Sequence, residues 1–153
     1  MTSQNIPKLI LTNCPYYLIT RSSLSITSAL KKAFNDADIT KVKPSYLGVL
    51  MILWSEDGLK MIELGRRAQL EPSSMTGLLD RMERDELVKR ELDPSDRRVQ
   101  RIFLTEYGIS IQNDVIRIVF TLLDSVFDGI PKDHIEIAKS VLRQVLTNIK
   151  SNS

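Results

Sequence analysis

Small hydroxyl side chains and a pair of adjacent arginines are the residues whose types and spacing point most clearly to chemistry. Ser73, Ser74 and Thr76 fall together at the start of a segment with helical periodicity. Its apolar side chains recur at spacings of three and four and form a separate stripe: Met75, Leu78, Leu79 and Met82. A helix that lies in a DNA groove needs short side chains at its N-terminal end, where its backbone approaches base edges and its amides point at phosphates. The pattern therefore predicts a helix that can enter a DNA groove.

The adjacent arginines, Arg97 and Arg98, follow in a segment with strand character. Residues 88–92 and 99–104 carry β-branched or aromatic side chains in partial alternation, and the stretch between them holds Asp, Pro and Ser. This predicts a β-hairpin with a polar tip that ends in the two arginines. A protruding ribbon with two guanidinium groups suits a narrow minor groove of strongly negative potential. Helix and hairpin together predict a winged helix-turn-helix.

The rest of the chain has helical periodicity. The helix over residues 61–69 lacks a capping side chain, because Lys60 precedes it, whereas Thr105 is expected to cap one long fifth helix that ends at Gly129. Three further helices are predicted over residues 15–36, 44–56 and 132–150. The predicted fold class is mainly α with a small β-wing, a winged helix-turn-helix with N- and C-terminal dimerisation helices.

The terminal helices carry more apolar surface than a compact winged-helix core can cover. Within one domain of residues 1–153, residues 40–108 form the expected DNA-binding lobe, and residues 1–36 and 109–153 the expected dimerisation helices. Residues 1–13 have no clear period and are interpreted as an arm that packs on a partner. Uncovered apolar stripes imply a partner, and self-association by intertwined terminal helices is the simplest one.

Composition excludes several classes of protein. The 153-residue chain is 42% apolar and 26% charged, as ordinary globular proteins are. Its longest apolar run, residues 47–54, is far shorter than the roughly 20 residues of a membrane span. Residues 1–8 lack the basic-then-apolar order of a secretory signal, and a single cysteine, Cys14, rules out an internal disulfide. These features favour a cytoplasmic protein without a membrane partner.

The net charge of +2 is small for a protein that binds nucleic acid. Between Arg81 and Arg101, acidic and basic side chains are interleaved, so one face, and not the sum, would have to be basic. The interleaved acids include Glu83, Asp85, Glu86 and Glu91. The charge favours specific, salt-sensitive binding over general coating of DNA. It also supports a second hypothesis, a winged-helix protein-interaction module that does not bind DNA.

Over nearly its whole length the chain resembles the MarR family, the multiple-antibiotic-resistance-type transcription regulators of bacteria and archaea. The sequence LGRRA at residues 64–68 resembles the family's third helix, LLDRME at 78–83 its recognition helix, and LVKR at 87–90 its first wing strand. Asp96-Arg97-Arg98, followed after six residues by Thr105-x-x-Gly108, matches the wing signature. Together at fixed spacing, these pieces form a specific pattern.

The resemblance implies roles for individual residues. Arg98 falls on the wing arginine that enters the minor groove, Asp96 on the acid that steadies it, and Arg97 on a phosphate contact. The residues expected to meet the major groove are Ser73, Ser74, Thr76, Gly77 and Arg81.

The resemblance also implies partners. Members of the family act as homodimers on near-palindromic double-stranded DNA, often as repressors released by small phenolic or other anionic effectors or by cysteine oxidation. No cofactor is expected. Two positions depart from the family pattern: Gly77 replaces a side chain that is often larger and polar, which would reduce base readout there, and Gly65 replaces the usual Ala.

Cys14 is a candidate redox site, because oxidation-sensing members of the family hold a reactive cysteine near the start of the first helix, where a helix N-terminus can favour thiolate. In those members two tyrosines engage the sulfur. Leu30 and Lys43 stand about where these tyrosines would fall, although other tyrosines are nearby. An ordinary half-buried thiol is the alternative.

An effector pocket is a further hypothesis, because an anionic aromatic ligand needs an apolar slot and one cation. It would lie between the dimerisation helices and the DNA-binding lobe, with core packing as the alternative for its aromatic residues and solvent exposure for its arginine. The candidate residues are Tyr17, Arg21, Tyr46 and Trp54.

A metal site and an enzyme are both disfavoured. His134, with Asp133 and Glu136, offers one imidazole and two carboxylates, but a charged first turn of a helix explains them without a metal. The sequence contains no phosphate loop, no histidine cluster and no nucleophile with a paired base, so no catalytic residue is assigned.

Overall fold

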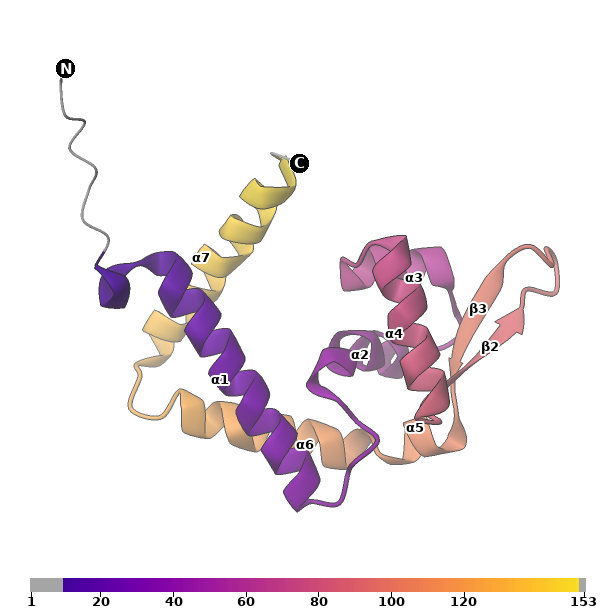
Figure 1. The fold of residues 1–153 in the computed structure, drawn as a ribbon, viewed down its shortest axis with the longest axis horizontal. Helices are drawn as coiled ribbons and strands as arrows, with labels where there is room; N and C mark the ends of the chain where they lie inside the picture. Colours follow the sequence, from indigo (N-terminus) through magenta and orange to yellow (C-terminus); the bar gives the residue numbers. More distant parts are fainter. Residues whose placement is uncertain (1–9, 152–153) are drawn as a thin grey trace. The chain divides into compact units, whose positions relative to one another are not determined.

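The computed structural model describes residues 10–151 (Figure 1), so most of the expected N-terminal arm lies outside the described residues. The chain divides into two compact units, Met1–Val119 and Phe120–Ser153, and the winged helix-turn-helix belongs to the first. The elements in chain order are η1 Leu11–Asn13, α1 Pro15–Asp36, η2 Pro44–Tyr46, α2 Leu47–Ser55, β1 Leu59–Lys60, α3 Met61–Ala68, α4 Pro72–Arg84, β2 Val88–Leu92, β3 Gln100–Leu104, α5 Glu106–Ser110, α6 Gln112–Val126 and α7 Lys132–Ser151.

Helices α2, α3 and α4 form the core of the first unit, with α3 in contact with both of the others. The predicted helical stripe of α4 is confirmed, because all four of its apolar residues are buried. Helix α3 ends where Gln69 takes a left-handed conformation, with φ 58°. The fully buried side chains that the three helices contribute are Val49, Leu50, Leu53, Leu64, Met75, Leu79 and Met82.

The predicted hairpin is confirmed and forms part of a three-stranded antiparallel sheet with the order β1-β3-β2. Its register pairs Arg90 with Ile102 and Glu91 with Arg101. The sequence did not predict β1, which has two residues and pairs Leu59 with Ile102. This small strand ties the start of α3 to the wing.

The prediction of one long fifth helix was wrong, because the helix is interrupted at Ile111. That residue is the C-cap of α5, with φ −85° and ψ −4°, and its side chain is buried. Thr105 caps α5 as predicted, since its hydroxyl accepts a 2.9 Å hydrogen bond from the N–H of Gly108. The backbone N–H of Thr105 also donates to the carbonyl of Leu87 at 3.1 Å, and this bond holds α5 against the winged-helix lobe.

Several helices leave apolar side chains exposed. In α1 of the first unit these include Tyr16, Leu18, Ile19 and Leu24. In the second unit, α7 buries none of its described residues although it is amphipathic. Its exposed apolar side chains include Ile137, Val141, Leu142 and Leu146. Across residues 10–151, no helix is long and apolar enough to cross a membrane.

The close approach of α5 to the lobe gives a stability test at Gly108. A Cβ atom there would lie 2.2 Å from the carbonyl oxygen of Leu87, which is backbone and cannot move aside freely. We expect Gly108→Ala to lower the free energy of unfolding by about 1–3 kcal/mol in urea denaturation. Gly48→Ala in α2 is the matched control, because nothing lies within 4 Å of its added methyl group. It should stabilise by up to about 1 kcal/mol, and equal effects at both positions would contradict the proposed close approach.

Candidate nucleic-acid interface

The first turn of α4 presents the predicted hydroxyl groups at the surface. Ser73, Ser74 and Thr76 are all exposed, and the Thr76 hydroxyl donates to the carbonyl of Pro72 at 3.0 Å. Pro72 occupies the start of the helix, and the first turn contains no acidic residue. This helix end therefore combines short side chains with a favourable dipole for an anion.

About one turn of α4 separates Gly77 from Arg81, so Arg81 lies over Gly77. The Arg81 side chain is exposed, and its Nη1 would lie 3.6 Å from a Cβ atom built on Gly77. Helical side chains tilt toward the N-terminus of their helix. The Arg81 guanidinium therefore lies toward the same end of α4 as the exposed serines.

The acidic side chains interleaved between Arg81 and Arg101 form ion pairs or hydrogen bonds with residues of the first unit. Lys41, from the loop after α1, binds Glu86 at 2.7 Å, and Lys89 binds Glu91 at 2.7 Å. Asp85 accepts a 2.7 Å hydrogen bond from the buried Tyr46 hydroxyl. Burial, with this hydrogen bond, raises the pKa of Tyr46 to about 12.

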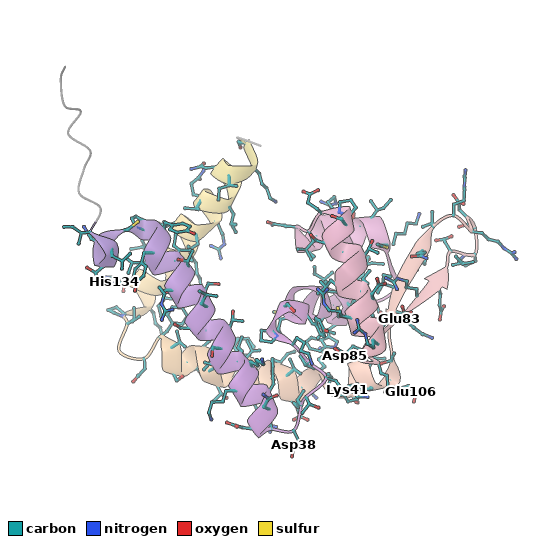
Figure 2. All side chains as sticks on the ribbon, in the orientation of Figure 1. Asp38, Lys41, Glu83, Asp85, Glu106 and His134 are labelled. Atoms are coloured by element: carbon teal, nitrogen blue, oxygen red, sulfur yellow. The ribbon has the colours of Figure 1, made fainter. Side chains whose placement is uncertain are left out.

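Arg90 of β2 binds two carboxylates of α4. Its Nη1 lies 2.6 Å from Glu83 and its Nη2 lies 2.7 Å from Asp80, while Nη2 also donates to the carbonyl of Thr76 at 3.4 Å. Figure 2 labels Glu83, near the end of α4. The Arg90 side chain is only 19% exposed. Arg90 was not among the predicted site residues; the available signal was an acid pair three residues apart on the recognition helix with an arginine on the following strand.

The base of the wing is organised by Asp93, a buried carboxylate with 2% of its surface exposed. It accepts hydrogen bonds from the hydroxyl and the N–H of Ser95, and its Oδ2 lies 2.6 Å from Nε of Arg101. These hydrogen bonds, first from Ser95 and then from Arg101, hold the pKa of Asp93 well below its usual range. Arg101 also donates to the carbonyl of Gly58 at 2.8 Å, which connects the wing to the segment before β1. Neither Asp93 nor Arg101 was among the predicted site residues.

At the tip of the wing the structure brings Asp96 and Arg98 together. Asp96 Oδ1 accepts from the N–H of Arg98 at 3.0 Å and from its Nε at 3.1 Å, and these bonds lower the pKa of Asp96. The Arg98 side chain remains 90% exposed. Arg97 beside it is exposed too and has no ion pair among the described residues. The tip therefore offers two accessible guanidinium groups, one of them oriented by a carboxylate.

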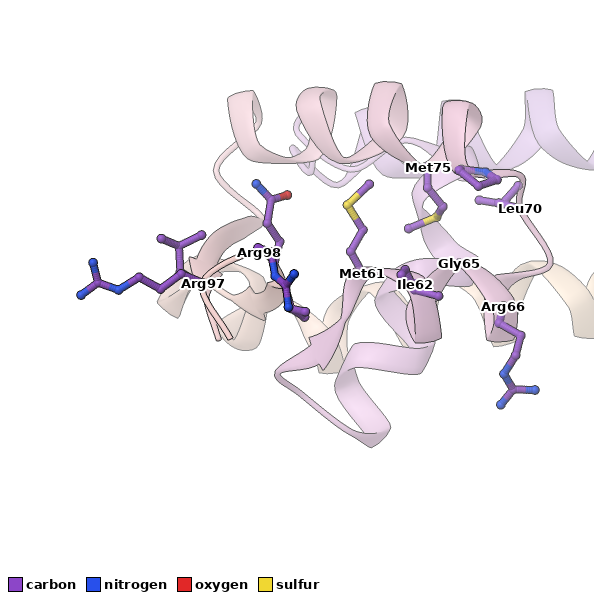
Figure 3. A pocket seen from close by; sticks show the side chains of 12 residues that line it. Met61, Ile62, Gly65, Arg66, Leu70, Met75, Arg97 and Arg98 are labelled. Carbon is purple, nitrogen blue, oxygen red and sulfur yellow. The ribbon is translucent and has the colours of Figure 1, made fainter. Parts of the chain in front are cut away.

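A hollow of about 490 Å³ lies between α3, the start of α4 and the wing. Figure 3 shows Met61, Ile62 and Met75 within it, while the guanidinium groups of Arg66 and Arg97 extend outward. No acidic residue contributes to its walls. The lining residues are Met61, Ile62, Gly65, Arg66, Leu70, Pro72, Met75, Leu92, Arg97, Arg98, Val99 and Gln100. The surface between helix and wing is therefore apolar with a cationic rim.

On α3, Glu63 is shared by two arginines. Nη2 of Arg66 and Nε of Arg67 each lie 2.7 Å from its carboxylate, and Arg67 also reaches Glu56 at 2.6 Å. These hydrogen bonds, Arg66 first, lower the pKa of Glu63 to about 2. Because these guanidinium groups are exposed and share carboxylates, this cluster is a solvated network of modest energetic weight.

The four candidate effector residues lie in different environments of the first unit. Tyr46 is buried in the core, and Trp54 is half-buried and donates from Nε1 to the carbonyl of Gly108 at 2.9 Å. Tyr17 is half-buried on α1, whereas Arg21 is exposed. The structure gives Tyr46 and Trp54 structural hydrogen bonds, and the effector pocket stays a prediction.

Cys14 and His134 also stay candidates without a formed site. Cys14 is a half-buried free thiol at the residue before α1. His134 lies near the start of α7 in the second unit (Figure 2). Within residues 10–151 no group of three His, Cys, Asp or Glu side chains could hold a metal ion.

A helix-turn-helix followed by a two-stranded wing, with short side chains on the second helix and arginines at the wing tip, defines the winged helix-turn-helix class. Comparison with known proteins narrows this class. Residues 44–99 match the family model described as "MarR family". The chain is 34% identical over 107 residues to the HTH-type transcriptional regulator YsmB of Bacillus subtilis (strain 168), covering 70% of this chain and 73% of that protein. It is 25% identical over 135 residues to the HTH-type transcriptional regulator MhqR of the same strain, covering 88% and 91%.

Solved structures agree with this placement. The structure of reduced AbfR bound to DNA superimposes with a TM-score of 0.71 at 25% identity, over 91% of this chain and 93% of that one. The chain belongs to the MarR family of transcription regulators. By family, therefore, the chain is a transcription regulator.

The buried carboxylate of the wing gives a pH test. Because the pKa of Asp93 is lower in the folded state than its usual value near 4, its ionised form contributes stability above about pH 4, and this contribution is lost as the pH falls below that value. We expect Asp93→Asn to be less stable than wild type in urea at about pH 7, with the difference shrinking toward about pH 3. Asp114→Asn on α6 is the control, because Asp114 is exposed and its ion pair with Arg117 lies at the surface. A difference for Asp93→Asn that stays constant across this pH range would contradict the assignment.

Proposed function

We propose that this protein is a homodimeric, sequence-specific DNA-binding regulator that inserts α4 in the major groove and the wing tip in the minor groove. One observation carries the proposal: on α4 and the wing, Asp80, Glu83 and Asp96 are engaged in ion pairs, while two arginines, Arg81 and Arg97, have no ion pair among residues 10–151. This surface is cationic although the chain has a net charge of only +2. The DNA-bound state of the AbfR structure supports the same use of the fold.

In the proposed complex the contacts divide by function. Ser73, Ser74, Thr76 and Gly77 lie at the major groove, where short side chains let the helix approach the bases. Arg98 enters the minor groove, steadied by Asp96, and Arg97 binds a phosphate. The cationic rim of the hollow between helix and wing carries no acid that would repel the intervening phosphates.

The exposed apolar faces support self-association. An amphipathic α7 without a buried residue leaves a stripe that a second copy of the chain can cover. A two-fold dimer places two recognition helices about one helical turn of DNA apart, which suits a near-palindromic operator. We therefore include residues 109–153 and the N-terminal helix in the dimer interface.

We further propose that the protein acts as a repressor released by a small anionic or aromatic effector. The candidate residues for that effector are Tyr17, Arg21, Tyr46 and Trp54. Release follows if the effector favours a dimer in which the two recognition helices have the wrong spacing, because affinity requires both half-sites at once. Oxidation of Cys14 is the alternative trigger, and a Cys14→Ser variant that is still released by peroxide would exclude it.

The wing is tested by Arg97→Ala/Arg98→Ala. Each phosphate contact contributes about 0.9 to the steepness of the slope of log affinity against log salt concentration. A dimer has two wings and therefore two Arg97 contacts, so the double variant should lose at least about tenfold in affinity and the slope should become less steep by close to 2. Electrophoretic mobility shifts with the DNA upstream of the protein's own gene, at several salt concentrations, measure both the affinity and the slope. The control is Lys139→Ala on α7, an exposed lysine of the second unit that pairs with Glu136. Unaltered affinity and slope would favour the protein-interaction hypothesis instead.

The dimer is tested by Leu142→Asp/Leu146→Asp on α7. Both side chains are exposed and apolar, so the substitution should convert a dimer to a monomer without unfolding the first unit. Sedimentation equilibrium measures the mass, and operator affinity should fall by about a hundredfold or more because only one half-site can be bound. Thr147→Asp is the control, since Thr147 is exposed, lies on the polar side of α7 and hydrogen-bonds the carbonyl of Arg143. A double variant that remains dimeric would contradict the interface.

A further inference from the structure

Gly77, like Gly48 of α2, is a helical glycine of the winged-helix lobe that no packing contact requires. At Gly65 a Cβ atom would lie 3.1 Å from Cγ of Met75, and at Gly108 it would lie 2.2 Å from the carbonyl oxygen of Leu87, so packing explains both. At Gly77 an added Cβ meets no backbone and only the tip of Arg81, at 3.6 Å. Glycine is a poor helix former, and here it stands in the interior of α4. Neither packing nor backbone conformation in the fold explains it.

Arg81 is one of two arginines of α4 without an ion pair among the described residues, and the other, Arg84, is the last residue of the helix. Asp80, the neighbour of Arg81, and the nearby Glu83 are both held by Arg90. The Arg81 side chain has no ion pair or hydrogen bond within residues 10–151, although carboxylates lie close by on the same helix. The pairing of Arg90 therefore leaves the Arg81 guanidinium available for an external acceptor.

The two residues share one face of α4. Ser73, Gly77 and Arg81 follow at intervals of four, so they lie one above another along the helix. The guanidinium extends along this row toward the N-terminal end of α4, through the space that a side chain at 77 would fill. The exposed Arg81 guanidinium therefore lies along a bare stretch of the recognition helix, with Nη1 3.6 Å from the position of a Cβ atom at Gly77.

From this geometry, and resting on the proposed DNA-binding function, we propose that Arg81 reads one guanine in each half-site and that Gly77 provides the space in which its guanidinium lies. Arginine binds guanine through O6 and N7 with two parallel hydrogen bonds, a pattern that no other base offers in the major groove. Gly77 thus contributes to sequence readout through its neighbour, although it has no side chain of its own.

The test begins with operators selected from random duplexes by the full-length protein. Each guanine of a half-site is then replaced singly by 7-deazaguanine, which lacks the N7 acceptor, and affinities are measured by fluorescence anisotropy. One guanine should stand out, with a loss of about tenfold for wild type and no further loss for Arg81→Ala. Arg81→Lys, which keeps the charge and lacks the fork, should retain the salt dependence and lose the selectivity for that guanine.

The role of Gly77 is tested in a double-mutant cycle. Gly77→Leu fills the space beside Arg81, so it should abolish the guanine selectivity in the wild-type background and leave Arg81→Ala unchanged at that position. Gly48→Leu on α2 is the matched control, because it adds the same side chain at an exposed helical glycine. Circular dichroism confirms that the variants are folded.

The outcomes separate the two levels of proposal. If no duplex is selected by the folded dimer, the proposed function fails. If duplexes are selected but no guanine depends on Arg81, or if Arg81→Lys keeps the selectivity, the readout by Arg81 is wrong. If Gly77→Leu weakens binding equally in both backgrounds, Gly77 serves the approach of the backbone to DNA and its partnership with Arg81 is wrong.

Discussion

The proposed DNA-reading surface, formed by the exposed residues of α4 and the wing tip, depends on the ion pairs of Arg90. The recognition helix carries two carboxylates, Asp80 and Glu83, which would repel a phosphate strand if they were unpaired. Arg90 reaches both from the neighbouring strand and also contacts the carbonyl of Thr76. A planar guanidinium can make these contacts at once, whereas a lysine ammonium could not reproduce their geometry. One side chain therefore engages both carboxylates of the helix and fixes its position against the sheet.

The wing is connected to the rest of the lobe through a second arginine. Arg101 of β3 binds Asp93 at the base of the wing and the carbonyl of Gly58 before β1. Since β1 leads directly into α3, the hairpin and the helix-turn-helix share one framework. The hydrogen bonds of Asp93 restrain the turn, while the Arg98 side chain at the tip extends into solvent. A restrained base with an extended tip suits a ribbon that must enter a groove at a fixed distance from the recognition helix.

The sequence predicted those elements whose periodicity is long enough to be distinctive. The stripe of α4 and the hairpin were predicted because each repeats its pattern over several residues. Strand β1 was missed since two residues carry no period, and the break at Ile111 was missed because an apolar residue there continues the helical stripe. Residue types at the reading surface were predictable as well, but their partners were not: Arg90 and Glu83 lie on different elements, and only the folded chain brings them together. The same limit made the net charge a poor guide, because it sums charges that the structure pairs.

The reading surface keeps one exposed apolar side chain and two arginines that have no ion pair among the described residues. Among the described residues no buried side-chain nitrogen or oxygen lacks a hydrogen-bond partner, so the chain satisfies its interior throughout. Ile62 nevertheless remains 86% exposed beside the hollow, and Arg81 and Arg97 remain without carboxylates. Folding alone would favour burial of Ile62 and ion pairs for Arg81 and Arg97. Departures from these rules of packing and pairing occur mainly where function requires them. These residues are cationic or apolar and none is acidic. A strand of nucleic acid, with apolar sugars and regularly spaced phosphates, is the partner that would satisfy both kinds together.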